Sequence, residues 1–501
     1  MADPFGARLP DVPFGVPGLD DVLIGGLPAN RVYLLEGDPG AGKTTLALQF
    51  LMDGRASGEV GLYVTLSETA EELHTVAASH GWSLEGIRVT ELATAEASLS
   101  ADAENTMFYP SEVELAQTTD VVLREVEATR PSRVVFDSLS EMRMLAQNPL
   151  RYRRQILALK RFFVGRSCTV LLLDDRTAGQ NDIQVQSIVH GVITLERRTP
   201  EYGVMQRRLQ IIKMRGKATR PGYHDFVIQK GGLRVFPRLV ASEHDSEYAA
   251  SMLSSGLPEL DLLIGGGLDR GTSALMVGPA GTGKSTFATQ FAVEAARRGE
   301  RVSMFLFDEG DRTLRARTAG LGIDLEAQLV AGKIKIRQVD PGELSAGELV
   351  QLVRDEVEVH GSRLIVVDSL NGYLNAIPDV RFLTLQLHEL LTYLSQRGVT
   401  SILVMAQAGM VGASMASPVD ASYLADSIFV LRYFEAAGEV RQAISVLKRR
   451  GGLHERTIRE FRFTAQGIRI GAPLSAFQGV LTGVPTFLGG TGGPLLGTNR
   501  G

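Results

Sequence analysis

The sequence predicts an α/β protein of two tandem domains, each a mainly parallel sheet flanked by helices. The pattern G-x-x-x-x-G-K-[ST] occurs twice, at 37–44 and 278–285, and a similar approach sequence precedes each copy. After each copy, apolar β-branched runs alternate with helical stretches, as expected for a parallel sheet covered by helices. The 501 residues exceed the usual size of one core. Self-similarity at a period of 241 residues indicates duplicated domains, because solenoid repeats are about 20–50 residues long.

The domain boundaries follow from the approach sequences, a polar segment and the composition of the chain end. The approaches lie at 15–28 and 256–269, the polar segment lies at 240–247, and residues 482–501 are rich in Gly, Pro and Thr. Such a terminal composition cannot bury much apolar surface. We therefore expect a first domain at 1–240, a linker at 241–250, a second domain at 251–476 and a flexible C-terminal tail at 477–501.

Each G-x-x-x-x-G-K-[ST] stretch lies between an apolar run and a helix-like segment, which is the context a phosphate-binding loop needs. Glycines let the backbone wrap closely around a phosphate chain, and the following helix contributes its positive end. The lysine reaches the terminal phosphates. The predicted nucleotide-binding residues are Gly37, Asp38, Pro39, Gly40, Ala41, Gly42, Lys43, Thr44 and Thr45 in the first copy, and Gly278, Pro279, Ala280, Gly281, Thr282, Gly283, Lys284, Ser285 and Thr286 in the second.

A predicted apolar strand that ends in aspartate follows each loop. Asp137 ends the first strand and Asp368 the second, and Ser-Leu follows both. At the carboxyl end of a parallel strand such an acid faces the nucleotide cleft and can hold magnesium directly or through water. The hydroxyls of Thr44 and Ser285 complete the two predicted Mg²⁺ sites.

Candidate catalytic acids follow the strand after the first helix of each copy. The second copy has Asp308 and Glu309, and the first has Ser67 and Glu68. Acids here also favour the first turn of the next helix by about 0.3–1 kcal/mol, which is the structural alternative. Their equivalent placement in both copies favours catalysis by Glu68, Asp308 and Glu309. Because serine cannot act as a carboxylate base, the first copy is left with one acid.

A basic pair followed by glycine ends a predicted strand late in each copy. Lys213 and Arg215 form the first pair, and Lys448 and Arg450 the second. Residues two apart on a strand share a face. A solvated strand edge is the alternative, but the recurrence favours cations that reach the nucleotide of a neighbouring subunit in a ring.

Composition limits the function classes. The formal net charge is -5, which argues against a nucleic-acid-coating surface. The lone Cys168 lies in an apolar run, so we expect a buried, inert thiol. The N-terminus lacks a signal-peptide pattern and no apolar run approaches bilayer length. We expect a soluble, cytoplasmic protein without a membrane partner.

Together these motifs resemble the KaiC family of circadian-clock ATPases and autokinases, over about residues 12–475. The two approaches, both phosphate loops, residues 63–69, both Asp-Ser-Leu strands and residues 213–216 carry the resemblance. It implies two tandem RecA-like P-loop NTPase domains, ATP and Mg²⁺ as cofactors, and a double-ring homo-hexamer with ATP between neighbouring subunits. It also implies a slow ATPase in the first domain and Ser/Thr autophosphorylation in the second, in clock-like or stress signalling with regulatory partners of the Kai type. Matching back from the strand at 426–431 makes Ser422 the phospho-acceptor, and Tyr423 stands where the family has Thr.

Two other function classes stay open. A nucleotide-gated interaction platform with little catalysis is favoured for the first domain by Ser67. A RecA-like DNA recombinase or helicase needs basic or aromatic loops that track a strand. The segment 176–186 has one basic residue and 406–425 has none, which disfavours nucleic acid as a partner.

Overall fold

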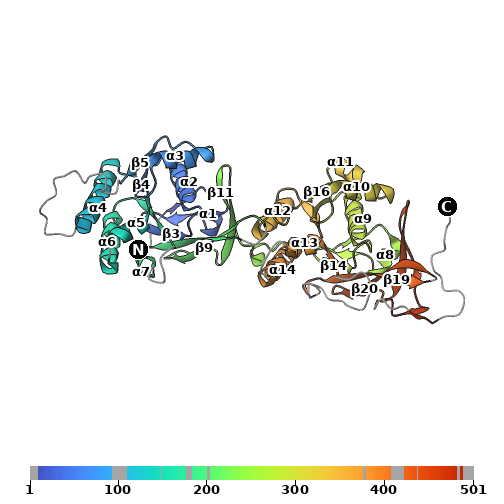
Figure 1. Ribbon diagram of the computed structural model, residues 1–501. Helices are drawn as coiled ribbons and strands as arrows, with labels where there is room; N and C mark the ends of the chain where they lie inside the picture. Colours follow the sequence, from blue (N-terminus) through green and yellow to red (C-terminus); the bar gives the residue numbers. More distant parts are fainter. Residues whose placement is uncertain are drawn as a thin grey trace, which may run out of the picture. The chain divides into compact units, whose positions relative to one another are not determined.

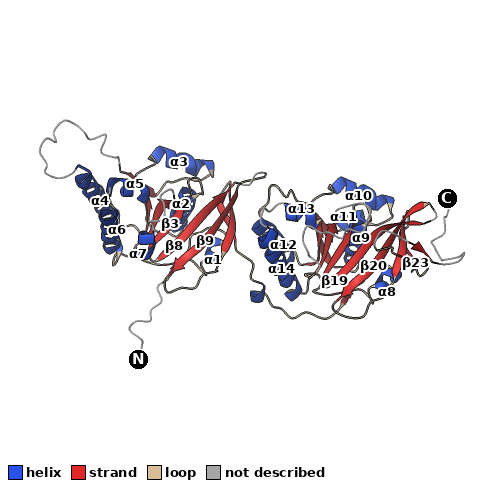
Figure 2. Ribbon diagram, turned by 60° about the horizontal axis from the view of Figure 1, so that its bottom comes forward, coloured by secondary structure: helices blue, strands red, loops and turns tan. Residues whose placement is uncertain are grey.

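The computed structural model describes residues 10–92, 110–146, 148–176, 183–199, 203–375, 380–407, 423–436, 438–481 and 486–488. The chain divides into two compact units, and the main change from one to the other lies between Arg238 and Leu239. Figures 1 and 2 show that each unit is a twisted sheet with helices on both faces.

The first unit is built on a nine-stranded sheet in the order β11-β10-β9-β8-β3-β7-β6-β4-β5. The run from β8 to β5 is parallel, and β9, β10 and β11 extend it antiparallel. The strands are β3 (Val32–Gly37), β4 (Gly61–Thr65), β5 (Ile87–Glu91), β6 (Arg133–Asp137), β7 (Thr169–Asp175), β8 (Gly191–Arg198), β9 (Gln206–Met214), β10 (Tyr223–Gln229) and β11 (Gly232–Phe236). A separate ribbon pairs β1 (Asp11–Val12) with β2 (Leu27–Pro28).

Alternate residues of the buried strands enter two cores, one on each face of this sheet. Tyr33 and Leu35 of β3 pack with one helix layer, whereas Val32 and Leu34 pack with the other. This alternation follows from the two-residue period of a strand. The first layer is α1 (Leu19–Val22), α2 (Lys43–Ala56) and α3 (Ala70–Ser79), and the second is α4 (Pro110–Thr129), α5 (Leu139–Ala146), α6 (Pro149–Phe163) and α7 (Ile183–Ile188).

The second unit repeats this architecture in the order β16-β15-β17-β18-β14-β19-β20-β21-β22, parallel from β16 to β19 and antiparallel beyond. Its strands are β14 (Ser273–Gly278), β15 (Arg301–Leu306), β16 (Ile334–Gln338), β17 (Ser362–Asp368), β18 (Thr400–Ala406), β19 (Ser427–Ala436), β20 (Glu439–Arg449), β21 (Ile458–Thr464) and β22 (Gly467–Pro473). One face carries α8 (Pro258–Leu263), α9 (Lys284–Arg297), α10 (Asp311–Gly320) and α11 (Leu325–Val330); the other carries α12 (Ala346–Glu358), α13 (Leu370–Asn375) and α14 (Val380–Gln396).

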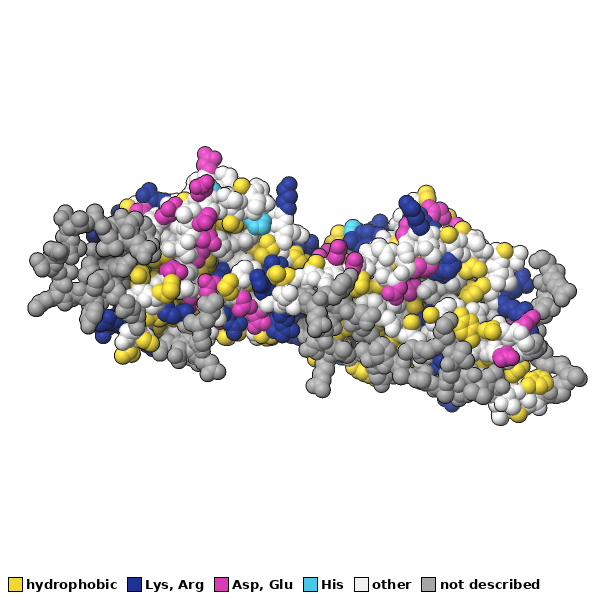
Figure 3. Space-filling model, in the orientation of Figure 1, with side chains coloured by type: hydrophobic (Ala, Val, Ile, Leu, Met, Phe, Trp, Pro, Cys, Tyr) yellow, Lys and Arg dark blue, Asp and Glu magenta, His cyan; other side chains and the backbone are white. Residues whose placement is uncertain are grey.

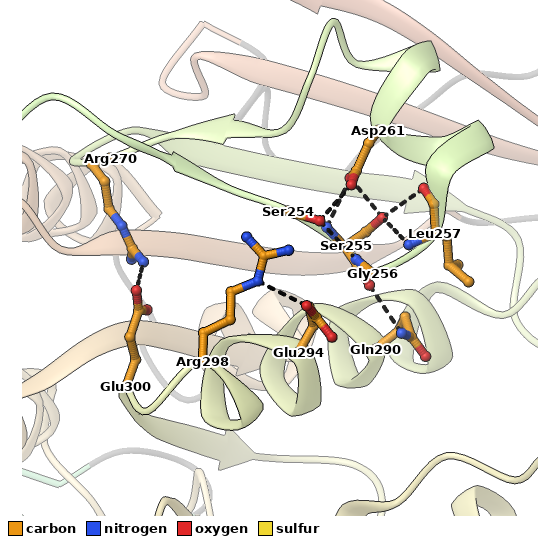
Figure 4. A network of polar contacts seen from close by, with 10 residues as sticks. All are labelled: Ser254, Ser255, Gly256, Leu257, Asp261, Arg270, Gln290, Glu294, Arg298 and Glu300. Carbon is orange, nitrogen blue, oxygen red and sulfur yellow. Dashed lines mark hydrogen bonds and ion pairs between the residues drawn. The ribbon is translucent and has the colours of Figure 1, made fainter.

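The second approach sequence is tied to the phosphate-loop helix through Ser255, the residue just before it. The Asp261 carboxylate accepts hydrogen bonds from the Ser255 backbone N–H (2.8 Å) and hydroxyl (2.7 Å). Gln290 of α9 donates to the Ser255 carbonyl at 2.9 Å (Figure 4). In the first unit Gln49 instead pairs with Leu233 of β11. The equivalent glutamines, Gln49 and Gln290, therefore anchor the phosphate-loop helix in both units, through different partners.

The linker and part of the tail pack onto the second unit. A 3₁₀ turn, η3 (Ala241–Glu243), follows the change between units. Tyr248 covers Gly398, where an added Cβ would lie 2.4 Å from the tyrosine ring. In the tail, β23 (Phe477–Gln478) pairs with β24 (Thr486–Phe487), and the Phe477 ring lies 5.8 Å from that of Phe434. The short strands β12 (Met252–Leu253) and β13 (Leu268–Asp269) form a further ribbon.

Several sequence predictions are confirmed at this level. Both units have the expected mainly parallel sheet flanked by helices. The sequence pattern of Thr69 followed three residues later by Glu72 is typical of a capping box, and these two residues form one at the start of α3. The Cys168 thiol is buried, and burial raises its pKa to about 12. Within the described part of the chain, no helix has both the length and the apolar character needed to cross a membrane.

Candidate functional site

The predicted phosphate-loop residues and acids gather at the carboxyl ends of the parallel strands in each unit. The phosphate loops follow β3 and β14, which lie inside their sheets, and Asp137 and Asp368 end β6 and β17. This edge is where ligands bind in open α/β sheets.

The second phosphate loop depends on two glycines with left-handed backbone. Gly281 has φ 77° and Gly283 has φ 96°. An added Cβ on Gly283 would lie 2.2 Å from the ring of Phe463, which β21 brings over the loop. Gly283 is the N-cap of α9, so the free N–H groups of that helix face the loop.

Lys284 and Asp368 form the charged centre of the second site. Lys284 Nζ donates to the Pro279 carbonyl at 2.7 Å, and burial lowers the pKa of Lys284 to about 8. Burial raises the pKa of Asp368, a hydrogen bond from the Ser285 hydroxyl lowers it, and the nearby charge of Glu309 raises it. The hydroxyl and the carboxylate that the sequence assigns to magnesium are thus in contact.

The two acids after β15 have different partners. The Ser369 hydroxyl, directly after β17, donates to Asp308 Oδ2. Glu309 is bound by Arg317 of α10, with Nη2 2.7 Å from Oε2 and Nε 3.1 Å from Oε1. The third nitrogen of this guanidinium, Nη1, donates to the Thr286 hydroxyl.

A cavity of about 860 Å³ unites these groups. This volume is in the range of small-molecule and cofactor sites, about 300–1,000 Å³. Its polar lining includes Lys284, Ser285, Asp308, Glu309 and Asp368.

In the first unit, an ion pair holds the phosphate-loop lysine. Lys43 Nζ donates to the carbonyls of Gly37 (2.9 Å) and Asp38 (3.0 Å) and lies 2.6 Å from Asp175 Oδ1. Asp175 ends β7, and the parallel pairing of β3 and β7 puts it directly opposite Gly37. Ala406 ends the equivalent strand of the second unit, so Lys284 has no such counter-ion there.

The first unit's acids are buried with a tyrosine. Tyr63 of β4 donates to Asp137 Oδ2 at 2.6 Å, and burial, strengthened by the charge of Asp137, raises the pKa of Tyr63 well above 10.0. Burial, then the charge of Asp137, raises the pKa of Glu68, and a polar contact with the Thr44 hydroxyl lowers it. Ser67 is exposed, and Glu68 Oε2 is buried without a hydrogen-bond partner among the described residues.

The two basic pairs bind backbone of their own chain. Lys213 Nζ donates to the carbonyls of Gln186 (2.6 Å) and Val189 (2.9 Å), and Arg215 donates to that of Ser187. Each pair thus connects the end of its own strand to a neighbouring segment: β9 to the segment before β8 in the first unit, and β20 to the segment before β19 in the second. In the second unit the contacts are Lys448 to the Ala425 carbonyl, and Arg450 to Asp426 (3.0 Å) and to the Tyr423 carbonyl.

The sequence places both pairs on a strand, but the structure corrects one detail. Arg215 and Arg450 lie just past the ends of β9 and β20 and are exposed. Neither Lys448 nor Arg450 is among the residues that line the 860 Å³ cavity of its own unit.

The remaining predicted residues are placed as follows. The predicted acceptor Ser422 lies outside the described residues, and its neighbour Tyr423 is exposed. Asp38 Oδ2 accepts the Arg197 backbone N–H, and Thr282 donates to the Pro279 carbonyl at 2.8 Å. Thr45 is buried at the start of α2.

Four residues at these sites were missed from the sequence: Tyr63, Asp175, Arg317 and Phe463. Tyr63 and Asp175 come from strands whose neighbours are known only once the strand order is known. Arg317 lies in the last turn of α10, whereas Glu309 lies two residues before that helix, so no helical spacing relates the two residues. Phe463 carried no sequence signal either.

Comparison with known proteins identifies the fold family. The model of the family described as "ATPase: KaiC" matches residues 12–240 and 253–475. The RecA-like character predicted for the two units is therefore confirmed, and so is nucleotide binding as a family property.

Named relatives agree with this match over almost the whole chain. The protein is 27% identical to the circadian clock protein KaiC3 of Synechocystis sp. PCC 6803, over 94% of both chains. It is 28% identical to the circadian clock oscillator protein KaiC of Parasynechococcus marenigrum, over 95% of this chain and 93% of the relative. The corresponding KaiC of Thermosynechococcus vestitus is 26% identical, over 96% and 92%. The chain belongs to the KaiC family of ATPases.

Proposed function

We propose that the second unit binds ATP with Mg²⁺ and transfers its terminal phosphoryl group to water and to a serine of this protein, Ser422. The observation that supports this best is the convergence of five groups on one cavity: Lys284, Ser285, Asp308, Glu309 and Asp368. Positioning and electrostatic stabilisation are what phosphoryl transfer requires of a protein.

Each group has a role in this proposal. Lys284 neutralises the terminal phosphates, and its buried ammonium regains full charge beside them. Asp308 or Glu309 orients the attacking hydroxyl and accepts its proton as the bond from oxygen to the γ-phosphorus forms and the bond to ADP breaks. The contact between Ser285 and Asp368 fits a hard cation, since both offer oxygen ligands. Bound there, Mg²⁺ would neutralise phosphate charge.

Incubation with γ-labelled ATP, followed by peptide mapping, tests the kinase half. We expect label at Ser422, no label there in Ser422→Ala, and loss of all labelling in Lys284→Ala. Glu309→Gln, which keeps the shape of the side chain, should lower transfer while ATP still binds. Full labelling of Lys284→Ala would refute the assignment of this site.

We further propose a double-ring hexamer in which Lys213 and Arg215, and Lys448 and Arg450, contact the nucleotide of a neighbouring subunit. The exposure of both arginines next to strand ends supports this. Native mass determination with and without ATP tests it. A monomer under both conditions would exclude it.

For the first unit a nucleotide-gated platform is a second candidate. The Lys43–Asp175 ion pair favours it, because a bound phosphate must compete with a carboxylate 2.6 Å from the lysine. Ser67 also leaves Glu68 as the lone acid of the pair. Lys43→Ala should then abolish assembly and leave ATP turnover mostly unchanged. A large fall in turnover with assembly intact would instead make the first unit an ATPase.

A clock-like or stress-signalling role with regulatory protein partners is proposed from the relatives, which are named as circadian clock proteins. A nucleic-acid role is disfavoured. On the face seen in Figure 3, acidic and basic side chains are interspersed over both units. Salt-dependent binding of single-stranded DNA at physiological ionic strength would contradict this.

A further inference from the structure

The ion pair between Glu309 and Arg317 is unusual in engaging both carboxylate oxygens of a candidate catalytic acid. The guanidinium lies 2.7 Å from Oε2 and 3.1 Å from Oε1. Such a fork fixes the orientation of a carboxylate as well as its charge. The two side chains are 21% and 25% exposed, so water screens the pair incompletely.

The same guanidinium reaches the phosphate-loop helix. Its Nη1 donates to the hydroxyl of Thr286, the residue after Ser285. Thr286, Glu309 and Arg317 all line the 860 Å³ cavity. Arg317 therefore ties the acid to the first turn of α9, inside the space the nucleotide would occupy.

The first unit lacks this cation. Val76, which is 241 residues before Arg317, takes its place on α3 and packs against the core. There Glu68 Oε2 is buried, and it has no hydrogen-bond partner in the part of the chain that the structure describes. The equivalent acids, Glu68 and Glu309, thus have different surroundings in the two units.

We propose that Arg317 is a positioning residue that restrains Glu309 and thereby limits turnover at the second site. While both oxygens accept from the guanidinium, the carboxylate keeps the orientation of the ion pair, and only its remaining lone pairs can accept from an attacking hydroxyl or water. This inference rests on the proposed role of Glu309 in phosphoryl transfer. Because the fork acts on the acid and not on nucleotide binding, Arg317 affects kcat more than KM.

The test compares ATP turnover in variants of the full chain that carry Glu68→Gln, which silences the first site. Arg317→Val supplies the first unit's residue, and Arg317→Lys keeps the charge but loses the fork. We expect Arg317→Val to raise kcat about two- to fivefold, the scale of one partly exposed ion pair, with KM changed less than kcat. The kcat of Arg317→Lys should lie between the kcat of Arg317→Val and that of the parent.

Arg315→Val is the matched control. Arg315 lies on the same helix and makes forked ion pairs with Asp311 and Glu326, but it does not line the 860 Å³ cavity. The substitution Arg315→Val should leave kcat unchanged, even if it lowers the melting temperature. If Arg317→Val lowers the melting temperature as Arg315→Val does but does not raise kcat, the ion pair is purely structural and the inference is overturned. A fall in kcat that Arg317→Lys restores would also overturn it, because Arg317 would then act on the nucleotide.

Failure of the proposed function gives a different result. In the same background, Glu309→Gln and Lys284→Ala would then turn over ATP as fast as the parent, whatever Arg317 does. If those two variants are slow and Arg317→Val equals the parent, the site is catalytic and only the restraint is wrong.

Discussion

His224 makes the stability of the first unit depend on pH. Its ring is fully buried on β10. Nδ1 accepts the Arg238 backbone N–H at 2.8 Å, and Nε2 lies 3.2 Å from the Arg220 carbonyl, so the neutral ring carries its proton on Nε2. Burial lowers the pKa of His224 from 6.5 to about 4; the contact with the Arg220 carbonyl raises it, and the charges of Arg238 and Arg220 lower it.

The sign of the effect follows from linkage. Below pH 6.5 the unfolded chain protonates this histidine while the folded unit does not, so the free energy of unfolding falls as pH falls. The loss becomes complete near pH 4. With about 1.36 kcal/mol for each pKa unit, the full effect is roughly 3 kcal/mol, and the step from pH 7 to pH 5 removes about 2 kcal/mol.

His224→Asn isolates this effect, because an amide oxygen still accepts the Arg238 N–H but does not titrate. Denaturant unfolding is followed by the fluorescence of Trp82, the chain's single tryptophan, which packs in the first unit's core. Between pH 7 and pH 5 we expect the parent to lose about 2 kcal/mol more than the variant. His74→Gln, on an exposed position of α3, is the control and should follow the parent. Equal pH dependence of parent and His224→Asn would refute the reasoning.

Three further predictions concern the sites and the core. Tyr63→Phe removes the donor to the buried carboxylate that ends β6, and should cost about 1.5–3 kcal/mol of first-unit stability in the Trp fluorescence assay; no loss would mean that the carboxylate is otherwise satisfied. Gly283→Ala should abolish ATP binding at the second site, since its Cβ would strike Phe463 and its φ is 96°, whereas Gly310→Ala, with nothing within 4 Å, should bind normally in an equilibrium titration. The Cys168 thiol, whose pKa is about 12, should resist iodoacetamide at pH 8 until the chain unfolds; rapid labelling of the native protein, measured by mass, would contradict its burial.

Short sequence patterns predicted the fold and the main residues of each site, because these features are formed by residues that lie close together in the chain. A phosphate loop needs glycine, lysine and a hydroxyl within eight residues, and the capping box of Thr69 and Glu72 needs four. The contact between Tyr63 and Asp137 joins residues 74 apart, and it arises because β4 pairs with β6. No short-range pattern contains that pairing.

The comparison of the two sites made from the sequence was limited in the same way, because short-range patterns do not show which residues surround each acid. Counting acids makes the second site the better equipped, with Asp308 and Glu309 against Glu68 alone. The structure adds what surrounds each acid. Arg317 forms an ion pair with Glu309, whereas burial raises the pKa of Glu68.

A carboxylate with a raised pKa is the stronger base once ionised, because proton-transfer efficiency follows basicity. The first site is therefore poorer in acids, but it has Val76 at the position equivalent to Arg317 and so has no arginine there to pair with Glu68. If restraint rather than acid count sets the rate, installing the cation by Val76→Arg should slow the first site as Arg317→Val speeds the second. If Val76→Arg slows the first site and Arg317→Val speeds the second, the difference in rate between the units comes from this one equivalent position on α3 and α10, and not from Ser67.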